Sequence, residues 1–351
     1  MKDNIILHNL TTGYKGKAEI SKNLSATLRS EELTCLLGPN GAGKSTLLRT
    51  LSAFQKPLGG SIEVLGSRLS SYSKKQLSKI VSVVLTDNSG IRNMTAWEVV
   101  CMGRSPYTGF WGRLSERDKT IVKKSFQLID IEWLKDRKMH TLSDGECQKV
   151  MIAKALAQET PIIILDEPTA YLDYPSKIQM MLLLHRLAKT LKKTIFLSTH
   201  DLEHALQIAD QIWLLDPKLG LTTGSPEDLS LAGSIEKYFN REGIAFDSEH
   251  FTFNISHNTP REVTVKGNKD SIEYKLCCTA LQRNGIRPTD ENNDSSVSIC
   301  IPGDGTFRLV ENGTETYKVE KIEHILHTVV PAIVKDKISQ IRTAADLSQY
   351  E

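Results

Sequence analysis

The segment Gly38–Thr46 has the residue types and the spacing that bind phosphate groups. It reads Gly-Pro-Asn-Gly-Ala-Gly-Lys-Ser-Thr and matches the pattern G-x-x-x-x-G-K-[ST]. Glycines let the backbone wrap closely around an anion and adopt positive φ angles, and free N–H groups at the start of a helix attract negative charge. We therefore expect this loop to hold the phosphates of a nucleoside triphosphate.

The side chains that end this loop have predictable partners. Lys44 would reach the β- and γ-phosphates, and the hydroxyl of Ser45 would ligate Mg²⁺. The other loop residues expected to contact the nucleotide are Gly38, Asn40, Gly41, Gly43 and Thr46. A surface glycine turn before an ordinary helix is the alternative, and the apolar run before the loop counts against it.

Two adjacent acids, Asp166 and Glu167, form the second chemical group. They follow the apolar run Pro161–Leu165, and two like charges at the mouth of a buried strand are unfavourable unless a cation or strong donors meet them. Asp166 is placed to hold Mg²⁺, and Glu167 to orient an attacking water and accept its proton. A merely polar strand end would not explain why the pair accompanies a phosphate loop.

Strands and helices must bring these residues together. Leu33–Leu37 is an apolar run suited to a buried strand before the loop. His200 also follows a predicted strand, residues 194–198, and strand ends form the usual ligand edge of an open α/β sheet. Further strands are predicted at residues 4–8, 24–29, 61–65, 80–85 and 212–215. The predicted fold class is therefore α/β.

Composition narrows the class of protein. The chain has 351 residues, enough for two domains, and a net charge of +2, which gives no general reason to expect nucleic-acid binding. Its six cysteines lack C-x-x-C spacing, which favours a reducing compartment. No apolar run approaches the roughly 18 residues that span a bilayer. We expect a cytoplasmic protein.

The order of the motifs resembles that of an ABC-type ATPase. After the phosphate loop come the segments Leu142–Glu146, Ile164–Glu167, Tyr171–Asp173 and Ser198–His200. The resemblance covers residues 1 to about 250 and counts against kinases and GTPases, which lack the Ser-x-Gly helix start. It implies a P-loop ABC-type ATPase domain with a mixed sheet core, antiparallel strands and a helical subdomain at about residues 87–160.

The resemblance also implies how the nucleotide is held. Tyr14 would stack on adenine, although a lone tyrosine is more often a packing residue. Ser143 and Gly145 belong to the signature motif, in which Asp144 and Glu146 stand where the family often has Gly and Gln. Two copies would form a head-to-tail dimer, with each ATP between one phosphate loop and the partner's signature motif.

Three further residues receive roles from the resemblance. Asp173 would lie in the loop that contacts the other subunit, and His200 would contact the γ-phosphate. Glu167 would be the catalytic base of an ATP hydrolase that uses Mg²⁺.

One position departs from the family pattern. The family has a Gln at the end of strand 80–85, which contacts Mg²⁺ and water and couples to the transporter, and this chain has Thr86 followed by Asp87. The side chain of threonine is too short to reach Mg²⁺ and the water as the side chain of glutamine does. Either Asp87 supplies the oxygen or the loop lies closer.

A local similarity points to one branch of the family. Gly103–Tyr107 and Phe110–Ser115 are similar to subunits that energise import of iron–siderophore complexes, haem or cobalamin. This implies a membrane permease docked near residues 86–115, a periplasmic binding protein, and a location on the inner face of the cell membrane. The candidate docking residues are Arg104, Tyr107, Phe110 and Trp111. Packing within the helical subdomain is the equal alternative for them.

The last hundred residues have a different pattern. Strands are predicted at 261–266 and 297–301, a helix from about 268, a hairpin of 306–310 with 314–319, and a final helix from Ile322. The expected domains are an ATP-binding domain at 1–255, a small α+β accessory domain at 256–335 and a polar tail at 336–351. A regulatory or dimer-stabilising role is favoured over ligand sensing.

The leading hypothesis is the ATPase motor of an importer, and one alternative comes from another class. A soluble ABC-type ATPase acting on nucleic acid or ribosomes usually has two ATPase modules or a long coiled-coil insertion. This chain has a single phosphate loop and no heptad run. The transported substrate and the direction of transport stay open, because this subunit does not touch the cargo.

Overall fold

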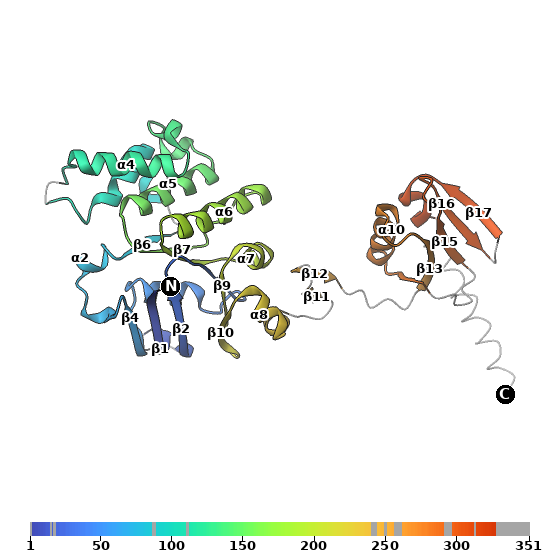
Figure 1. Ribbon diagram of the computed structural model, residues 1–351, viewed down its shortest axis with the longest axis horizontal. Coiled ribbons are helices and arrows are strands. Elements are labelled where there is room, and N and C mark those ends of the chain that lie inside the picture. The colour runs from blue at the N-terminus through green and yellow to red at the C-terminus, as the bar shows by residue number, and fades with distance from the viewer. Residues whose placement is uncertain are drawn as a thin grey trace. The chain divides into compact units, whose positions relative to one another are not determined.

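The computed structural model describes residues 2–14, 16, 19–85, 89–109, 112–239, 244–248, 251–255, 262–290, 297–311 and 314–327. The chain divides into two compact units, Met1–Arg241 with Phe246–Phe253, and Glu242–Ala245 with Asn254–Glu351. Each unit has a hydrophobic core of its own. Figure 1 shows the first unit in blue to yellow and the second in brown to red.

A six-stranded sheet of order β10-β9-β3-β8-β7-β6 forms the centre of the first unit. The strands are β3 (Leu33–Leu37), β6 (Val81–Val84), β7 (Ile162–Asp166), β8 (Thr194–Ser198), β9 (Gln211–Asp216) and β10 (Gly220–Gly224). All pair in parallel except β10, which runs antiparallel to β9. The loop after β3, Glu167 after β7 and His200 after β8 therefore emerge at one edge of the sheet.

The central strands are apolar along their length because both faces of the sheet are covered. In β7, Ile163 and Leu165 enter the core shared with the surrounding helices, whereas Ile162 and Ile164 enter the core on the other face. Successive side chains of a strand point to opposite faces, and a parallel sheet is normally covered on both. The residues of β7 do not alternate between apolar and polar because neither face of the strand is exposed to solvent.

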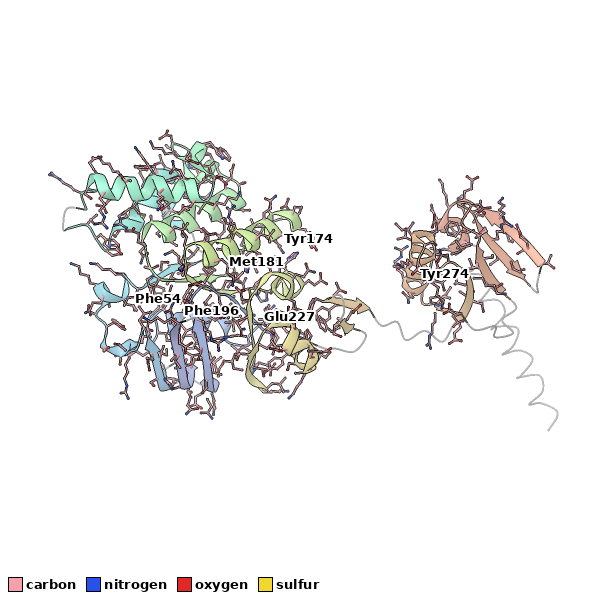
Figure 2. The ribbon with its side chains drawn as sticks, viewed as in Figure 1. Phe54, Tyr174, Met181, Phe196, Glu227 and Tyr274 are labelled. Carbon is pink, nitrogen blue, oxygen red and sulfur yellow. The ribbon has the colours of Figure 1, made fainter. Side chains whose placement is uncertain are left out.

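An antiparallel sheet of order β2-β1-β4-β5 contributes to the second of these cores. Its strands are β1 (Asp3–Gly13), β2 (Glu19–Arg29), β4 (Gly59–Val64) and β5 (Ser67–Arg68), and the helices in this part are α1 (Lys44–Leu51) and α2 (Lys74–Leu77). Leu7 of β1 shares the core with Phe196 and Trp213 of the central sheet, whose ring centroids lie 4.9 Å apart. Figure 2 labels Phe196 within this region.

A group of helices is inserted between β6 and β7. The helices are α3 (Ala96–Cys101), α4 (Glu116–Leu128) and α5 (Asp144–Ala157). Short 3-10 turns accompany them at η2 (Ser89–Ile91), η3 (Met102–Arg104), η4 (Glu132–Leu134) and η5 (Met139–Thr141), and a further one, η1 (Leu69–Ser71), precedes α2. Thr95, Ser115 and Ser143 each begin a helix with a capping box. Residues within one turn of the helix therefore fix where each of these three helices begins.

The remaining helices of the first unit are α6 (Tyr174–Thr190), α7 (Leu202–Ile208), α8 (Pro226–Leu231) and α9 (Ser234–Phe239), followed by the two-stranded sheet of β11 (Ile244–Asp247) and β12 (Thr252–Ile255). Aromatic contacts hold this small sheet to the first unit. The ring centroid of Phe253 lies 5.2 Å from that of Phe246 and 6.5 Å from that of Phe239. Neither β10 nor this pair of strands was expected from the sequence.

The second unit is a five-stranded sheet of order β14-β13-β15-β16-β17 with one described helix longer than two turns. Its elements are β13 (Glu262–Gly267), α10 (Ile272–Arg283), β14 (Arg287–Thr289), β15 (Val297–Ile301), β16 (Phe307–Glu311) and β17 (Thr314–Val319). β13 is parallel to β14 and β15, and the other pairs are antiparallel. Residues 322–327 are helical.

Most elements of this unit match the expectation. The predicted hairpin is β16 with β17, although its turn residues Asn312 and Gly313 lie outside the described residues. The helix begins at Ile272, after the N-cap Ser271, rather than near residue 268. The strand β14 was not predicted, because three residues that include a proline give no strand pattern.

Within the described ranges, no helix has the length and apolar character needed to cross a membrane. Each of the six cysteines is free.

Candidate functional site

The loop between β3 and α1 has the geometry of an anion cradle. Gly41 and Gly43 have φ angles of 81° and 97°, which favour glycine, and Gly43 is the N-cap of α1. A Cβ atom on Gly38 would lie 2.1 Å from the carbonyl oxygen of Leu215 at the end of β9. The loop thus needs its glycines both for its turns and for its close approach to the sheet.

Lys44 lies inside this loop. Its Nζ atom donates to the carbonyl oxygens of Gly38 and Pro39, at 2.7 and 3.2 Å, and the residue is buried. Burial lowers the pKa of the lysine, while the carboxylates of Glu167 and Asp166 act in the opposite direction. The negative charges of both acids therefore favour the protonated form of Lys44.

The acids at the end of β7 are held by the neighbouring strand. Asp166 and Ser198 are register partners on β7 and β8. Ser198 Oγ donates to Asp166 Oδ1 at 2.7 Å and accepts the backbone N–H of Glu167 at 3.0 Å. Glu167 has a φ angle of 49°, a left-handed conformation that is uncommon for residues other than glycine.

His200 lies against the second acid. Its Nε2 atom is 2.5 Å from Glu167 Oε1, and both side chains are partly exposed to solvent. Residue Asp201 fixes the segment that carries the histidine, because its carboxylate accepts from Thr169 Oγ1 and from Lys177 Nζ, each at 3.1 Å. The structure therefore brings the sequence-predicted Glu167 and His200 into direct contact.

The predicted signature residues lie at the start of α5. Ser143 is the N-cap, and its hydroxyl accepts the backbone N–H of Glu146 at 3.3 Å. The carboxylate of Glu146 lies 3.6 Å from a guanidinium nitrogen of Arg137. A Cβ on Gly145 would meet only Leu172, at an ordinary 3.6 Å, so packing within this chain does not account for the glycine.

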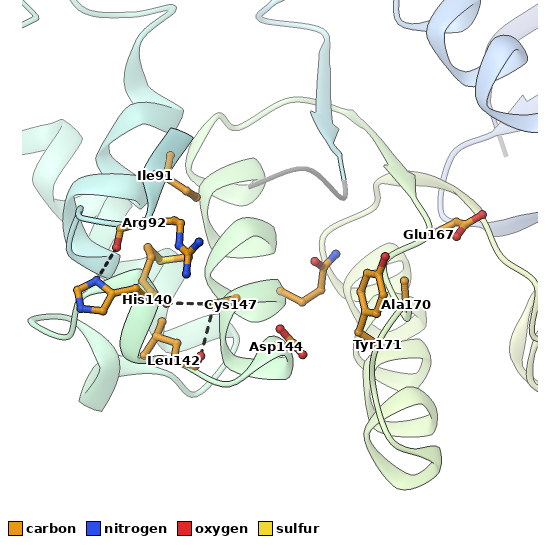
Figure 3. A pocket seen from close by; sticks show the side chains of 11 residues that line it. Ile91, Arg92, His140, Leu142, Asp144, Cys147, Glu167, Ala170 and Tyr171 are labelled. Atoms are coloured by element: carbon orange, nitrogen blue, oxygen red, sulfur yellow. Dashed lines mark hydrogen bonds between the residues drawn. The ribbon is translucent and has the colours of Figure 1, made fainter. Parts of the chain in front are cut away.

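A cavity of about 440 Å³ separates this helix start from the loop after β7. It is lined by Ile91, Arg92, Met139, His140, Leu142, Asp144, Cys147, Gln148, Glu167, Ala170 and Tyr171. Figure 3 shows Asp144 and Cys147 on one side of the cavity and Tyr171 and Ala170 on the other. Helix and loop are thus two walls of one cleft, with Glu167 at its border.

Two residues at the cleft are exposed to solvent. Tyr171 has a φ angle of 65° and 86% of its surface exposed. Asp173 caps α6 by accepting the backbone N–H of Ser176 at 2.9 Å, and these hydrogen bonds from Ser176 lower the pKa of the aspartate. Asp173 therefore has a capping role within this chain whatever it contacts in a second copy.

Tyr14 lines a second cavity, of about 710 Å³. Its lining residues are Gly13, Tyr14, Arg49, Phe54, Gln55, Lys56, Pro57 and Leu58. The side-chain amide of Gln55 donates to the carbonyl oxygen of Gly13, which joins the Tyr14 turn to the segment that follows α1. The tyrosine is partly exposed beside space large enough for a planar base.

The structure corrects one candidate for a docking residue, Arg104. Only 3% of it is exposed, and its guanidinium binds Asp118 Oδ1 at 2.9 Å, the Ala157 carbonyl at 2.7 Å and Glu159 Oε2 at 2.9 Å. Packing within the helical subdomain is therefore its role. The ring of Tyr107 stacks on this guanidinium, whose Cζ atom lies 4.1 Å from the ring centroid. Tyr107 is nevertheless partly exposed to solvent.

Four predicted residues lie outside the described residues: Thr86, Asp87, Phe110 and Trp111. In contrast, Ser198 lies in the described site and sequence reasoning did not single it out. A serine at the end of an apolar strand gives no signal until the register of β7 and β8 is known.

Comparison with known proteins agrees with this fold. The family model described as ABC transporter matches residues 21–170. An uncharacterized ABC transporter ATP-binding protein of Methanocaldococcus jannaschii is 38% identical over 250 residues, which cover 71% of this chain and 86% of that protein. The ferric enterobactin transport ATP-binding protein of Escherichia coli is 33% identical over 238 residues, covering 68% of this chain and 88% of that protein.

Two solved structures are similar to the fold described here. One is cbiO1 from Clostridium perfringens, part of the ABC transporter complex cbiONQ, with a TM-score of 0.60 and 27% identity over 67% of this chain and 94% of that chain. The other is an ATP-binding cassette in a dimeric post-hydrolysis state bound to ADP and Pi, with a TM-score of 0.55 and 27% identity. The match covers 63% of this chain and 98% of that one.

Proposed function

Because the chain belongs to the ABC transporter family of ATP-binding proteins, we propose that it is the ATP-hydrolysing motor of an importer for iron–siderophore complexes, haem or cobalamin. The observation that carries the proposal is the contact of Glu167 with His200 at the sheet edge from which the phosphate loop with Lys44 also emerges. Among the three cargoes, the relative named for ferric enterobactin transport supports a siderophore.

The phosphate loop and the turn after β1 would share the binding of ATP. Lys44 would exchange its two loop carbonyls for phosphate oxygens, and the N–H groups of the loop would donate to the same anion. Tyr14 would stack on the adenine in the cavity that it lines.

The oxygen ligands present fit Mg²⁺. This ion takes oxygen donors and usually keeps several waters, with one or two protein ligands beside the phosphates of a nucleotide. The hydroxyl of Ser45 follows the loop, and the carboxylate of Asp166 lies at the same sheet edge, near enough to Lys44 to act on its pKa. Thr86 or Asp87 would complete this set. When bound, Mg²⁺ neutralises phosphate charge during hydrolysis.

Glu167 and His200 would carry out the chemical step. Glu167 would orient the attacking water and accept its proton. His200, 2.5 Å from that carboxylate, would hold its orientation and contact the γ-phosphate. The hydrogen bonds of Asp201 to Thr169 and Lys177 keep the histidine segment in place during this step.

A second copy would complete the site. Ser143 and Gly145 lie at the start of α5, across the cleft from Glu167, and are proposed to bind the γ-phosphate of ATP held by the partner copy. The cleft position of Tyr171 and the exposed position of Asp173 support a contact of both residues with that copy. The similar dimeric cassette bound to ADP and Pi supports this arrangement.

The importer also requires a membrane permease, and a periplasmic protein that delivers cargo to it. We propose that the permease docks near residues 86–115, with Tyr107, Phe110 and Trp111 as candidate contacts, and that the chain lies on the inner face of the membrane. We further propose functional boundaries at 1–255, 256–335 and 336–351. The second domain would regulate the motor or stabilise its dimer.

Affinity purification from solubilised membranes tests the proposal. The tagged full chain is expected to co-purify with a polytopic permease. Disruption of the gene that encodes the chain is expected to impair growth on limiting iron or cobalamin. Recovery of ribosomes or nucleic acid without a membrane partner would instead support the soluble ABC-type ATPase. The similarity to the ferric enterobactin transport ATP-binding protein counts against the soluble ABC-type ATPase.

A further inference from the structure

Ser198, the last residue of β8, connects the two acids proposed for hydrolysis. It is fully buried, and its position opposite Asp166 follows from the parallel register of β7 and β8. Its hydroxyl donates to Asp166 Oδ1 at 2.7 Å and accepts the backbone N–H of Glu167 at 3.0 Å. One small side chain therefore contacts both residues.

These two hydrogen bonds use the only proton that the serine hydroxyl can donate. A hydroxyl has a single proton to donate, and here that proton goes to a carboxylate, which makes a stronger hydrogen bond than a neutral acceptor. Since the side chain is buried, no bulk water competes for either bond. The hydrogen bond to the N–H of Glu167 also stabilises a backbone with a φ angle of 49°. Residues other than glycine adopt such an angle only where surrounding contacts stabilise it.

We propose that Ser198 is a positioning residue for ATP hydrolysis, an inference that rests on the proposed function. By binding Oδ1, it orients Asp166 so that Oδ2 is the oxygen left for the metal. By binding the N–H of Glu167, it directs that side chain toward His200. A residue without a hydroxyl at position 198 would leave Asp166 Oδ1 and the backbone N–H of Glu167 without this partner.

The effect of Ser198 can be separated from that of the histidine segment. His200 and its neighbours are fixed independently through Asp201, which binds Thr169 and Lys177. Removal of the Ser198 hydroxyl is therefore expected to disturb Asp166 and Glu167 while this segment keeps its position. The defect should appear as a loss of metal-dependent binding and of turnover, with the binding of metal-free nucleotide retained.

Equilibrium binding gives the first test. In full chains that carry Glu167→Gln, so that ATP is not consumed, the affinity for a fluorescent ATP analogue is measured with and without Mg²⁺. Ser198→Ala is expected to leave the metal-free affinity unchanged and to reduce the gain in affinity on adding Mg²⁺ on the order of tenfold, the usual effect of losing a hydrogen bond to a charged group.

Turnover gives the second readout. In the otherwise unchanged chain, Ser198→Ala should raise the Mg²⁺ concentration for half-maximal ATPase activity and lower kcat, each on the order of tenfold. Ser198→Thr retains the hydroxyl and should recover most of both. Ser198→Cys keeps the size of the side chain and weakens both hydrogen bonds, so it should fall between the two and also covers a Ser198→Ala chain that fails to fold.

Ser82→Ala is the matched control. Ser82 is also buried in the sheet, on β6, and its hydroxyl accepts from Thr160 Oγ1 at 3.0 Å rather than touching a proposed site residue. It should lower thermal stability about as much as Ser198→Ala and leave the Mg²⁺ dependence unchanged.

The outcomes separate the inference from the proposed function. If the unchanged chain hydrolyses ATP and Glu167→Gln abolishes this, but the variants at Ser198 keep the normal Mg²⁺ dependence, the inference is wrong and the function stands. Equal changes in Mg²⁺ dependence for Ser82→Ala and Ser198→Ala would also overturn it. If the unchanged chain neither binds nor hydrolyses ATP, the proposed function itself is wrong.

Discussion

The contact between Glu167 and His200 singles out one carboxylate, that of Glu167, as the proposed base for ATP hydrolysis. The 2.5 Å separation of His200 Nε2 and Glu167 Oε1 gives the proposed base a direct partner within this chain. Lys44, Asp166 and Ser198 complete the same sheet edge. At this scale, the charge of Glu167 and its ability to accept a proton are the properties to test.

Glu167→Gln should retain ATP binding and lose at least about a hundredfold in kcat, because the amide cannot act as a general base. The measurement is steady-state phosphate release beside equilibrium binding of ATP. Lys44→Ala is the complementary variant and should lose binding itself. Near-normal turnover by Glu167→Gln would show that another group accepts the proton.

Arg104 shows how a charged residue can be structural. Replacement by Met would remove one donor each from Asp118, Glu159 and the Ala157 carbonyl, and breaking a buried pair costs about 3–5 kcal/mol. We expect Arg104→Met to lower the free energy of unfolding by about 3 kcal/mol, measured by urea titration. Arg117→Met, at an exposed position of α4, is the control and should change it by less than about 0.5 kcal/mol.

This contribution depends on pH in a defined direction. Hydrogen bonds from Ser115, and then from Arg104, lower the pKa of Asp118. The carboxylate is thus favoured in the folded state, so its stabilisation is complete above the ordinary pKa of aspartate and is lost as the pH falls through the lowered value. The difference in stability between Arg104→Met and the unchanged chain should therefore shrink in acid.

At the scale of elements, residues 246–253, which include part of β11 and part of β12, belong to the ATPase unit. Phe246, Phe251 and Phe253 pack against the core that also contains the helices around β7. Residues 246–253 are assigned to the first unit, whereas residues 242–245 and those from 254 onward are assigned to the second. Apolar surface near Phe239 would otherwise face water.

Phe253→Ala should destabilise the first unit by about 2 kcal/mol, through the lost burial of its ring and its contacts with Phe239 and Phe246. Thermal unfolding of chains 1–255 with and without the change measures this. Phe54→Ala removes a ring that is 64% exposed and serves as the control. Equal stability of the two variants would mean that the strand pair contributes nothing.

At the scale of the molecule, the second unit has a core and a sheet of its own. A separate core allows it to act on the motor without contributing to the proposed catalytic residues, which all lie in the first unit. The two roles proposed for it, regulation and dimer stabilisation, predict different behaviour when it is removed.

The chain 1–255 should therefore retain ATP hydrolysis, with a change whose form distinguishes the two roles. If the second unit stabilises the dimer, the specific activity of 1–255 falls on dilution and recovers at high protein concentration. If it regulates, the specific activity differs from that of the full chain at every concentration. Identical activity of both chains throughout the titration would contradict both roles.

Local features of this protein could be predicted because neighbouring residues decide them. The phosphate loop, the apolar strand before Asp166 and the capping box at Ser115 depend on residues a few positions apart, and the structure has each of them. The strands β11, β12 and β14 were missed because they are short, and their pairing and packing depend on distant parts of the chain.

The sequence alone determined which groups can do chemistry and the order in which they occur, because residue type and spacing are covalent facts. Only the tertiary structure decided that Arg104 is buried and that Ser198 binds Asp166, 32 residues earlier in the chain. A hydrogen bond or a buried ion pair belongs to two residues at once. Its existence therefore depends on strand register and helix packing, which no local pattern contains.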